Sequence, residues 1–163
     1  MKRILITGMS GTGKSSVIVE LIRRGYQAVD LDTPEWSHWV STVSNDGLTP
    51  REGQDWVWKE EAVRHLLRHN KAENLFVSGC AENMTQFYDL IDIVILLSAP
   101  RDTILERLSL RSGNAYGQSL EDRRKVIELI DMIEPMLRQS ATFEFDTQQP
   151  IATTVDEIIA KTV

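Results

Sequence analysis

Short apolar runs alternate with amphipathic stretches along the chain. Five runs have the length and apolar character of strands, at residues 4–6, 26–32, 75–77, 91–97 and 143–145. The first is followed by a helical pattern with a buried face formed by Val17, Ile18, Leu21 and Ile22. Later apolar residues recur at helical spacing near residues 54–69, 83–90, 101–112, 119–138 and 153–161. Strands alternating with helices form a parallel sheet, so the pattern predicts an α/β fold.

The length and composition of the chain indicate a single domain of ordinary size. The 163 residues are 42% hydrophobic and 26% charged, so we expect residues 1–163 to form a single domain. The formal net charge of −6 gives no overall positive field for nucleic acid, and we expect no nucleic-acid partner. An anionic ligand would need a local cluster of arginine or lysine.

Cysteine content and the length of the apolar runs predict a cytoplasmic protein. Cys80 is the only cysteine and cannot form an internal disulfide; it is more typical of a small buried residue than of a nucleophile. The longest apolar run, residues 93–97, is far shorter than the roughly 20 residues of a membrane span. The first residues do not resemble a signal peptide, so no membrane partner is expected.

A complete phosphate-binding loop lies between the first strand and the first helix. Residues 8–15 match the P-loop motif G-x-x-x-x-G-K-[ST], with a strand before it and a helix after it, which disfavours a simple glycine-rich turn. Lys14 would neutralise the β and γ phosphates, and the Ser15 hydroxyl would bind Mg²⁺. We therefore predict ATP and Mg²⁺ as cofactors. The candidate binding residues are Gly8, Met9, Ser10, Gly11, Thr12, Gly13, Lys14, Ser15 and Ser16.

With this motif the sequence resembles the nucleotide-kinase-like branch of P-loop proteins, which includes adenylate, shikimate and gluconate kinases. The resemblance implies a three-layer α/β/α fold with a five-stranded parallel sheet in the order 2-3-1-4-5. Asp30-Leu31-Asp32 resembles the D-x-D of shikimate kinases. This implies that Asp30 serves the metal and that Asp32 orients the acceptor hydroxyl or acts as its general base. Alternatively, both are solvated acids at a strand end, or Asp32 begins a turn.

Two arginines after the fourth strand resemble the R-x-x-x-R pair of adenylate kinases, in which one arginine covers adenine and the other reaches the phosphates. On a helical wheel, Arg107 and Arg111 flank the buried face formed by Ile104, Leu105 and Leu108. We predict that both arginines assist catalysis and that Arg107 also binds the cofactor. The alternative is that their stems only cover apolar surface.

The C-terminal part of the chain offers three weaker matches. Residues 143–151 resemble the I-D-T-x-x-P-[IL] stretch of nucleotide kinases, which implies cofactor contacts at Thr147 and Pro150, although a strand-to-helix turn explains the stretch equally well. Residues 112–119 lie where these kinases have a lid, so we predict a short one. Arg124, early in the next helix, is a candidate substrate-phosphate ligand or part of a solvated face.

Residues 33–70 are expected to form the acceptor-binding segment, because the resembling kinases bind their acceptors there. All four tryptophans fall within it, and Trp36 is the best candidate for an apolar wall beside Asp32 that would suit a ring-containing acceptor. Simple packing onto the sheet is the alternative. Gly79 ends a third strand that lacks the acid pair of motor ATPases, and it is a further candidate acceptor contact.

These features together predict an ATP-dependent phosphotransferase. It would move the γ-phosphoryl group to a small-molecule acceptor that is shikimate-like, a nucleoside or a nucleotide. Two alternatives stay open: a nucleotide-dependent switch or assembly ATPase with a macromolecular partner, and a degenerate nucleotide-binding module. The sequence leaves the oligomeric state open. The predicted catalytic residues are Lys14, Asp32, Arg107 and Arg111.

Replacement of the P-loop lysine tests the assignment of the motif. We expect Lys14→Met to lower ATP turnover by roughly three orders of magnitude or more, because the phosphates lose their fixed charge partner. Far-ultraviolet circular dichroism should be unchanged. Turnover close to that of the wild type in a folded Lys14→Met protein would contradict the assignment.

Overall fold

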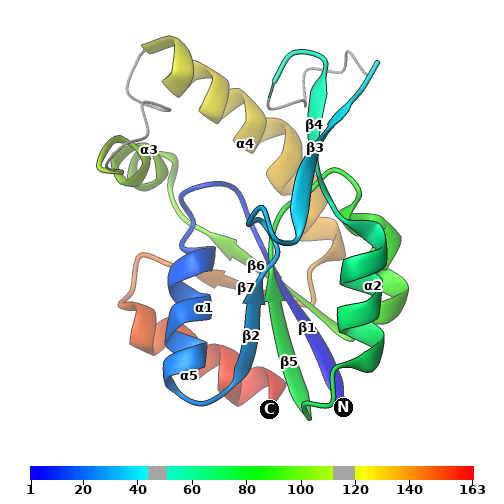
Figure 1. Cartoon of the computed structure of the whole chain (residues 1–163). Helices are drawn as coiled ribbons and strands as arrows, with labels where there is room; N and C mark the ends of the chain where they lie inside the picture. Colours follow the sequence, from blue (N-terminus) through cyan, green and yellow to red (C-terminus); the bar gives the residue numbers. More distant parts are fainter. Residues whose placement is uncertain (44–50, 112–119) are drawn as a thin grey trace.

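The structure is a computed structural model that describes residues 1–43, 51–111 and 120–163. Its helices and strands are labelled in Figure 1. In chain order they are β1 (Lys2–Thr7), α1 (Lys14–Arg23), β2 (Gln27–Asp30), β3 (Ser37–Ser41), β4 (Gln54–Trp58), α2 (Glu60–His69), β5 (Asn74–Ser78), the 3₁₀ helix η1 (Met84–Leu90), β6 (Ile93–Ser98), α3 (Arg101–Ser109), α4 (Leu120–Ser140), β7 (Phe143–Asp146) and α5 (Ile151–Thr162).

Five of these strands form one parallel sheet in the order β2-β5-β1-β6-β7. Numbered along the chain within this sheet alone, the order is 2-3-1-4-5, which confirms the prediction. β1 lies at the centre of this sheet. From β1 the chain first forms β2 and β5 on one side of it and then β6 and β7 on the other side. The carboxyl ends of the strands at this point form the edge where α/β sheets bind ligands.

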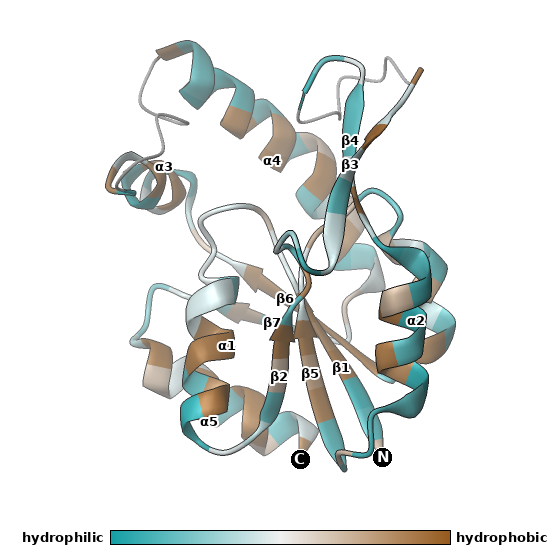
Figure 2. Ribbon diagram, in the orientation of Figure 1, coloured by the Kyte–Doolittle hydropathy of each residue, from teal (hydrophilic) through white to brown (hydrophobic). Residues whose placement is uncertain are grey.

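Alternation along each strand divides the core into two layers. On one face of the sheet, Ile4 and Ile6 of β1 pack with α1 and α5, while Leu5 points to the other face and packs with α2. These three β1 side chains are fully buried. Both faces are therefore apolar, and the middle parts of the strands are brown in Figure 2, so helices must cover both faces.

The segment between β2 and β5 contains a β-hairpin that the sequence reading missed. A helix is predicted near residues 54–69, but Gln54–Trp58 form β4 and the helix begins only at Glu60. β4 pairs antiparallel with β3, and Trp39 lies opposite Trp56. Aromatic and β-branched side chains favour this pairing once a partner strand is available. Figure 1 shows the hairpin beyond the carboxyl ends of the sheet strands.

Two further helix predictions differ from the structure in their bounds. The helix predicted for residues 101–112 ends at Ser109, so Arg111 follows it in non-helical backbone. The stretch predicted near residues 83–90 is the 3₁₀ helix η1. The predicted lid at residues 112–119 lies outside the described residues. Among the helices that the structure describes, none combines the length and apolar character needed to span a bilayer, and the cytoplasmic location stays a prediction.

Candidate active site

The P-loop connects β1 to α1 and wraps around the side chain of its own lysine. Gly11 and Gly13 adopt φ angles of 85° and 97°, which side-chain-bearing residues rarely tolerate. The Lys14 ammonium donates hydrogen bonds to the backbone oxygens of Gly8 at 2.7 Å and Met9 at 3.2 Å. The first turn of α1 contains no acid, so its N-terminal end keeps its positive field. The loop is thus preformed around a positive centre.

A hydroxyl and a carboxylate meet beside this loop. The Ser15 hydroxyl donates a hydrogen bond to Asp30 Oδ2 at 2.8 Å, although the two residues come from different elements. Both side chains offer oxygen ligands of the kind that Mg²⁺ prefers, and a P-loop Mg²⁺ takes few protein ligands besides phosphate and water. The pair therefore fits a Mg²⁺ ion bound together with ATP, as the sequence predicts.

Asp32 follows the end of β2 and is held there by groups from two other segments and by Asp30 of β2 itself. Its carboxylate accepts hydrogen bonds from the Cys80 backbone N–H, at 3.1 Å to Oδ2, and from the Trp58 indole N–H, at 3.4 Å to Oδ1. Its own backbone N–H donates to Asp30 Oδ1 at 3.0 Å. Burial raises the pKa of Asp32, although the Lys14 charge, the Cys80 amide and the indole N–H all oppose the shift. A half-buried carboxyl with a raised pKa is suited to accept a proton.

Gly79 makes room for this arrangement. A methyl group built on Gly79 would lie 2.7 Å from Asp32 Oδ1 and 2.9 Å from Trp58 Cζ2. Gly79 is a predicted acceptor contact. Its lack of a side chain also lets the Asp32 carboxylate and the Trp58 indole approach the backbone. The adjacent Cys80 is also half-buried, and desolvation of its thiol raises the pKa and disfavours the thiolate nucleophile.

Trp58 is the site residue that the sequence reading missed. It is 1% exposed and touches Asp32 directly, whereas the predicted contact, Trp36, is half-buried against the core cluster under α2. Proximity in sequence to Asp32 favoured Trp36. The only signal for Trp58 was its place in the alternating segment Trp56-Val57-Trp58, which indicates a strand rather than a helix.

On the other side of the P-loop, Arg107 links two loops. Its guanidinium donates to the Gly11 oxygen at 3.1 Å, the Thr147 hydroxyl at 2.9 Å and the Thr147 oxygen at 2.6 Å. Thr147 is 1% exposed and belongs to the loop that follows β7. In the structure, Arg107 therefore fixes the P-loop to this loop.

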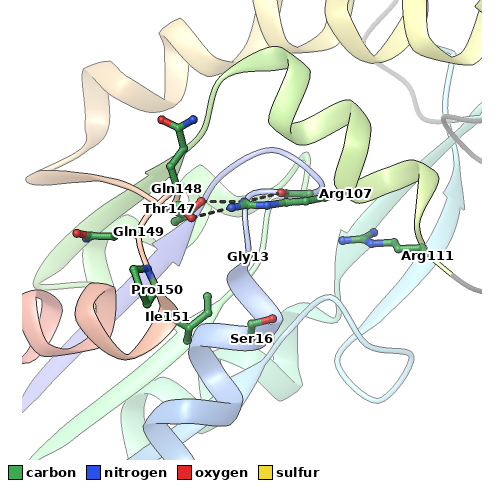
Figure 3. Close-up of a pocket in the computed structure, with 10 residues that line it drawn as sticks. Gly13, Ser16, Arg107, Arg111, Thr147, Gln148, Gln149, Pro150 and Ile151 are labelled. Carbon is green, nitrogen blue, oxygen red and sulfur yellow. Dashed lines mark hydrogen bonds between the residues drawn. The ribbon is translucent and has the colours of Figure 1, made fainter.

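These two loops enclose a pocket of about 580 Å³ beside the P-loop. Figure 3 shows Arg107 crossing it to Thr147, with Arg111 on the opposite rim. The lining residues are Gly11, Gly13, Ser16, Arg107, Arg111, Thr147, Gln148, Gln149, Pro150 and Ile151. This lining includes six of the twelve predicted cofactor residues, namely Gly11, Gly13, Ser16, Arg107, Thr147 and Pro150. Arg124 is exposed on α4 and does not line this pocket. Within the described part of the chain, it takes no part in the hydrogen bonds that join the other site residues.

Comparison with protein families and curated sequences gives two results. A family model described as an AAA domain matches residues 4–130. Among curated proteins, the HPr kinase/phosphorylase of Xanthomonas campestris pv. campestris (strain B100) is 29% identical over 118 residues, which are 72% of this chain and 35% of that protein. The chain spans about a third of the length of the curated relatives that it matches.

Solved structures match over nearly the whole chain. Shikimate kinase from Acinetobacter baumannii, in complex with shikimate, has a TM-score of 0.65 and 17% identity, and the match covers 100% of this chain and 96% of that one. A gluconokinase from Sinorhizobium meliloti 1021 has a TM-score of 0.61 and 20% identity, with 98% and 90% covered. At these identities the matches show the fold. The resemblance to shikimate and gluconate kinases is thereby confirmed at the level of architecture.

The close contact at Gly79 can be tested by stability. We expect Gly79→Ala to lower the free energy of unfolding by about 1–3 kcal/mol more than Gly25→Ala, because its methyl group must displace Asp32 or Trp58. Gly25 is the control, since it also has a positive φ but nothing within 4 Å of its built Cβ. Urea titration followed by circular dichroism measures both. Equal losses would show that Gly79 does not form the close contact.

Proposed function

The chain belongs to the AAA domain family, and we propose that it is an ATP-dependent phosphotransferase acting on a hydroxyl of a small organic acceptor. The observation that supports this best is the Asp32 carboxyl, which lies beside the P-loop lysine with a raised pKa and a fixed orientation. An acceptor hydroxyl must lose its proton when it attacks the γ-phosphorus, and a carboxylate fixed at this place can accept that proton.

The proposed reaction divides between two sides of the P-loop. On the nucleotide side, the P-loop amides and Lys14 hold the phosphates, while the pocket between Arg107 and Pro150 accommodates the nucleoside. Mg²⁺, held with ATP through Ser15 and Asp30, would neutralise charge on the phosphate oxygens. Arg111, on the pocket rim, is positioned to add positive charge near the transferring group.

On the acceptor side, Asp32 carries out the proton transfer. The acceptor oxygen attacks the γ-phosphorus, and the bond from that phosphorus to the β–γ bridging oxygen breaks. The hydroxyl proton moves to Asp32 Oδ and ADP leaves. The Cys80 amide and the Trp58 indole keep the carboxylate in place, so little reorganisation is needed when the acceptor binds.

An acceptor panel separates this proposal from a nucleotide-dependent switch. We expect ADP release from ATP–Mg²⁺ to be slow alone and to rise at least tenfold with one member of a panel of shikimate, gluconate, nucleosides and nucleoside monophosphates, because the acceptor supplies the nucleophile. A coupled spectrophotometric assay measures the rate. Basal hydrolysis that responds to none of these compounds, but to a protein such as HPr, would favour a macromolecular partner.

The pH dependence tests the role of Asp32. Since burial raises the pKa of Asp32, kcat/KM should fall with decreasing pH while the pH is still above the ordinary range of an aspartate, as the base becomes protonated. Asp32→Asn should lose about 10²–10⁴ in kcat/KM and lack this acidic limb. Glu35→Gln removes a nearby exposed carboxylate and is the control. An Asp32→Asn enzyme with the wild-type profile would exclude Asp32 as the base.

A further inference from the structure

The β3–β4 hairpin carries a row of tryptophans that starts at Asp32. Trp58 contacts Asp32 through its indole N–H, so this face of β4 is directed to the acceptor side of the site. Side chains two residues apart in a strand share a face, which places Trp56 on the same face as Trp58. The ladder pairs Trp56 with Trp39, and their ring centroids lie 5.0 Å apart. Trp39 and Trp56 therefore form an aromatic pair on the same face of the hairpin as Trp58.

The base of this surface is rigidly attached to the sheet. The Trp58 backbone N–H donates to Asn83 Oδ1 at 2.9 Å, and Asn83 Nδ2 donates back to the Trp58 oxygen at 3.0 Å. The Glu82 N–H donates to the Trp56 oxygen at 3.4 Å. β4 is thus bonded to β3 on one edge and to the loop after β5 on the other. A surface held this way can position a ligand relative to Asp32.

A cation lies at the outer end of the aromatic row. The Arg51 guanidinium stacks over the Trp39 ring, with its carbon 4.1 Å from the ring centroid. Because guanidinium N–H groups lie in the plane of the group, stacking on a ring leaves them directed sideways, where they can bind an anion. Trp39 and Trp56 are half-buried and Arg51 is exposed, whereas Trp58 is buried. The outer part of the row is therefore accessible to a ligand.

The order of these groups along the hairpin indicates which kind of ligand fits. Two residues of a strand span about 7 Å, so the Trp56–Trp39 pair follows Trp58, which contacts Asp32, and Arg51 stacks on Trp39 beyond it. A molecule that carries a ring between a hydroxyl and an anionic group presents its groups in the same order. The protein as a whole has a formal net charge of −6, so a fixed arginine here would be a local exception in an acidic surface.

We propose that the tryptophan face formed by Trp39, Trp56, Trp58 and Arg51 binds the acceptor and selects ring-bearing anions. The ring lies against Trp39 and Trp56, a hydroxyl reaches Asp32, and the carboxylate or phosphate of the acceptor binds Arg51. This inference rests on the proposed phosphotransferase function, since it specifies the substrate class of the same site.

Equilibrium binding tests the selection without any turnover. Isothermal titration calorimetry is done with two ring-bearing anions, shikimate and thymidine monophosphate, with their neutral counterparts methyl shikimate and thymidine, and with the ring-free anion gluconate. We expect at least one ring-bearing anion to bind about tenfold or more tightly than its neutral counterpart and than gluconate. The anion that binds distinguishes a carboxylate from a phosphate preference.

Variants then assign the binding to the tryptophan face. Arg51→Ala should weaken the anionic probe about tenfold and leave its neutral counterpart unchanged, while Trp39→Ala should weaken both. Trp39→Phe should restore most of the ring contact. Two controls should bind like the wild type: Arg68→Ala removes another exposed arginine, and His38→Ala alters the opposite face of the hairpin. Unchanged affinity for ATP–Mg²⁺ shows that each variant is folded.

Three outcomes would overturn the proposal. These are no binding of either ring-bearing anion to the wild type, equal binding of charged and neutral counterparts, and wild-type binding by both Arg51→Ala and Trp39→Ala. Failure of the phosphotransferase function gives a different pattern: the ring-bearing anion binds as expected, but ATP is hydrolysed without transfer to it.

Discussion

The hydrogen bonds to the Asp32 carboxylate are the contact on which the proposed acceptor side depends. They join the end of β2, the turn after β5 and the last residue of β4 around one charged group. The turn can come this close because Gly79 has no side chain. Burial raises the pKa of Asp32, whereas these hydrogen bonds oppose that shift. The contact thus fixes the orientation of the carboxyl and limits the rise of its pKa.

The nucleotide side is organised by a comparable contact, made by a cation. The Arg107 guanidinium donates hydrogen bonds to oxygens of Gly11 and Thr147. It thereby joins the P-loop to the loop after β7, and these two segments are far apart in sequence. The pocket beside the P-loop lies between these two loops. Sheet topology brings them to the same edge, and the arginine fixes their separation. The two sides of the proposed reaction meet at Lys14, whose charge acts on Asp32.

Sequence patterns were sufficient for the sheet but not for the acceptor side. Continuous apolar strands that alternate with helices predict a parallel sheet, and the resemblance carried by the complete P-loop implies its strand order. Asp30 and Ser15 could be paired by resemblance, and the structure brings them within 2.8 Å. The β3–β4 hairpin could not be predicted, since an amphipathic helix and a tryptophan-bearing strand share similar short apolar spacing. Trp58 was missed for this reason, and the linking contacts of Arg107 depend on tertiary distances that no local pattern contains.

The fate of the γ-phosphoryl group tests the central claim most directly. ATP labelled with ³²P at the γ position would be incubated with the protein, Mg²⁺ and each candidate acceptor, and the products separated by thin-layer chromatography. The account predicts that the label leaves ATP in a phosphorylated organic molecule, and that this product disappears with Asp32→Asn. Label found only in inorganic phosphate, or only on a protein, would contradict the claim that this P-loop protein phosphorylates a small molecule.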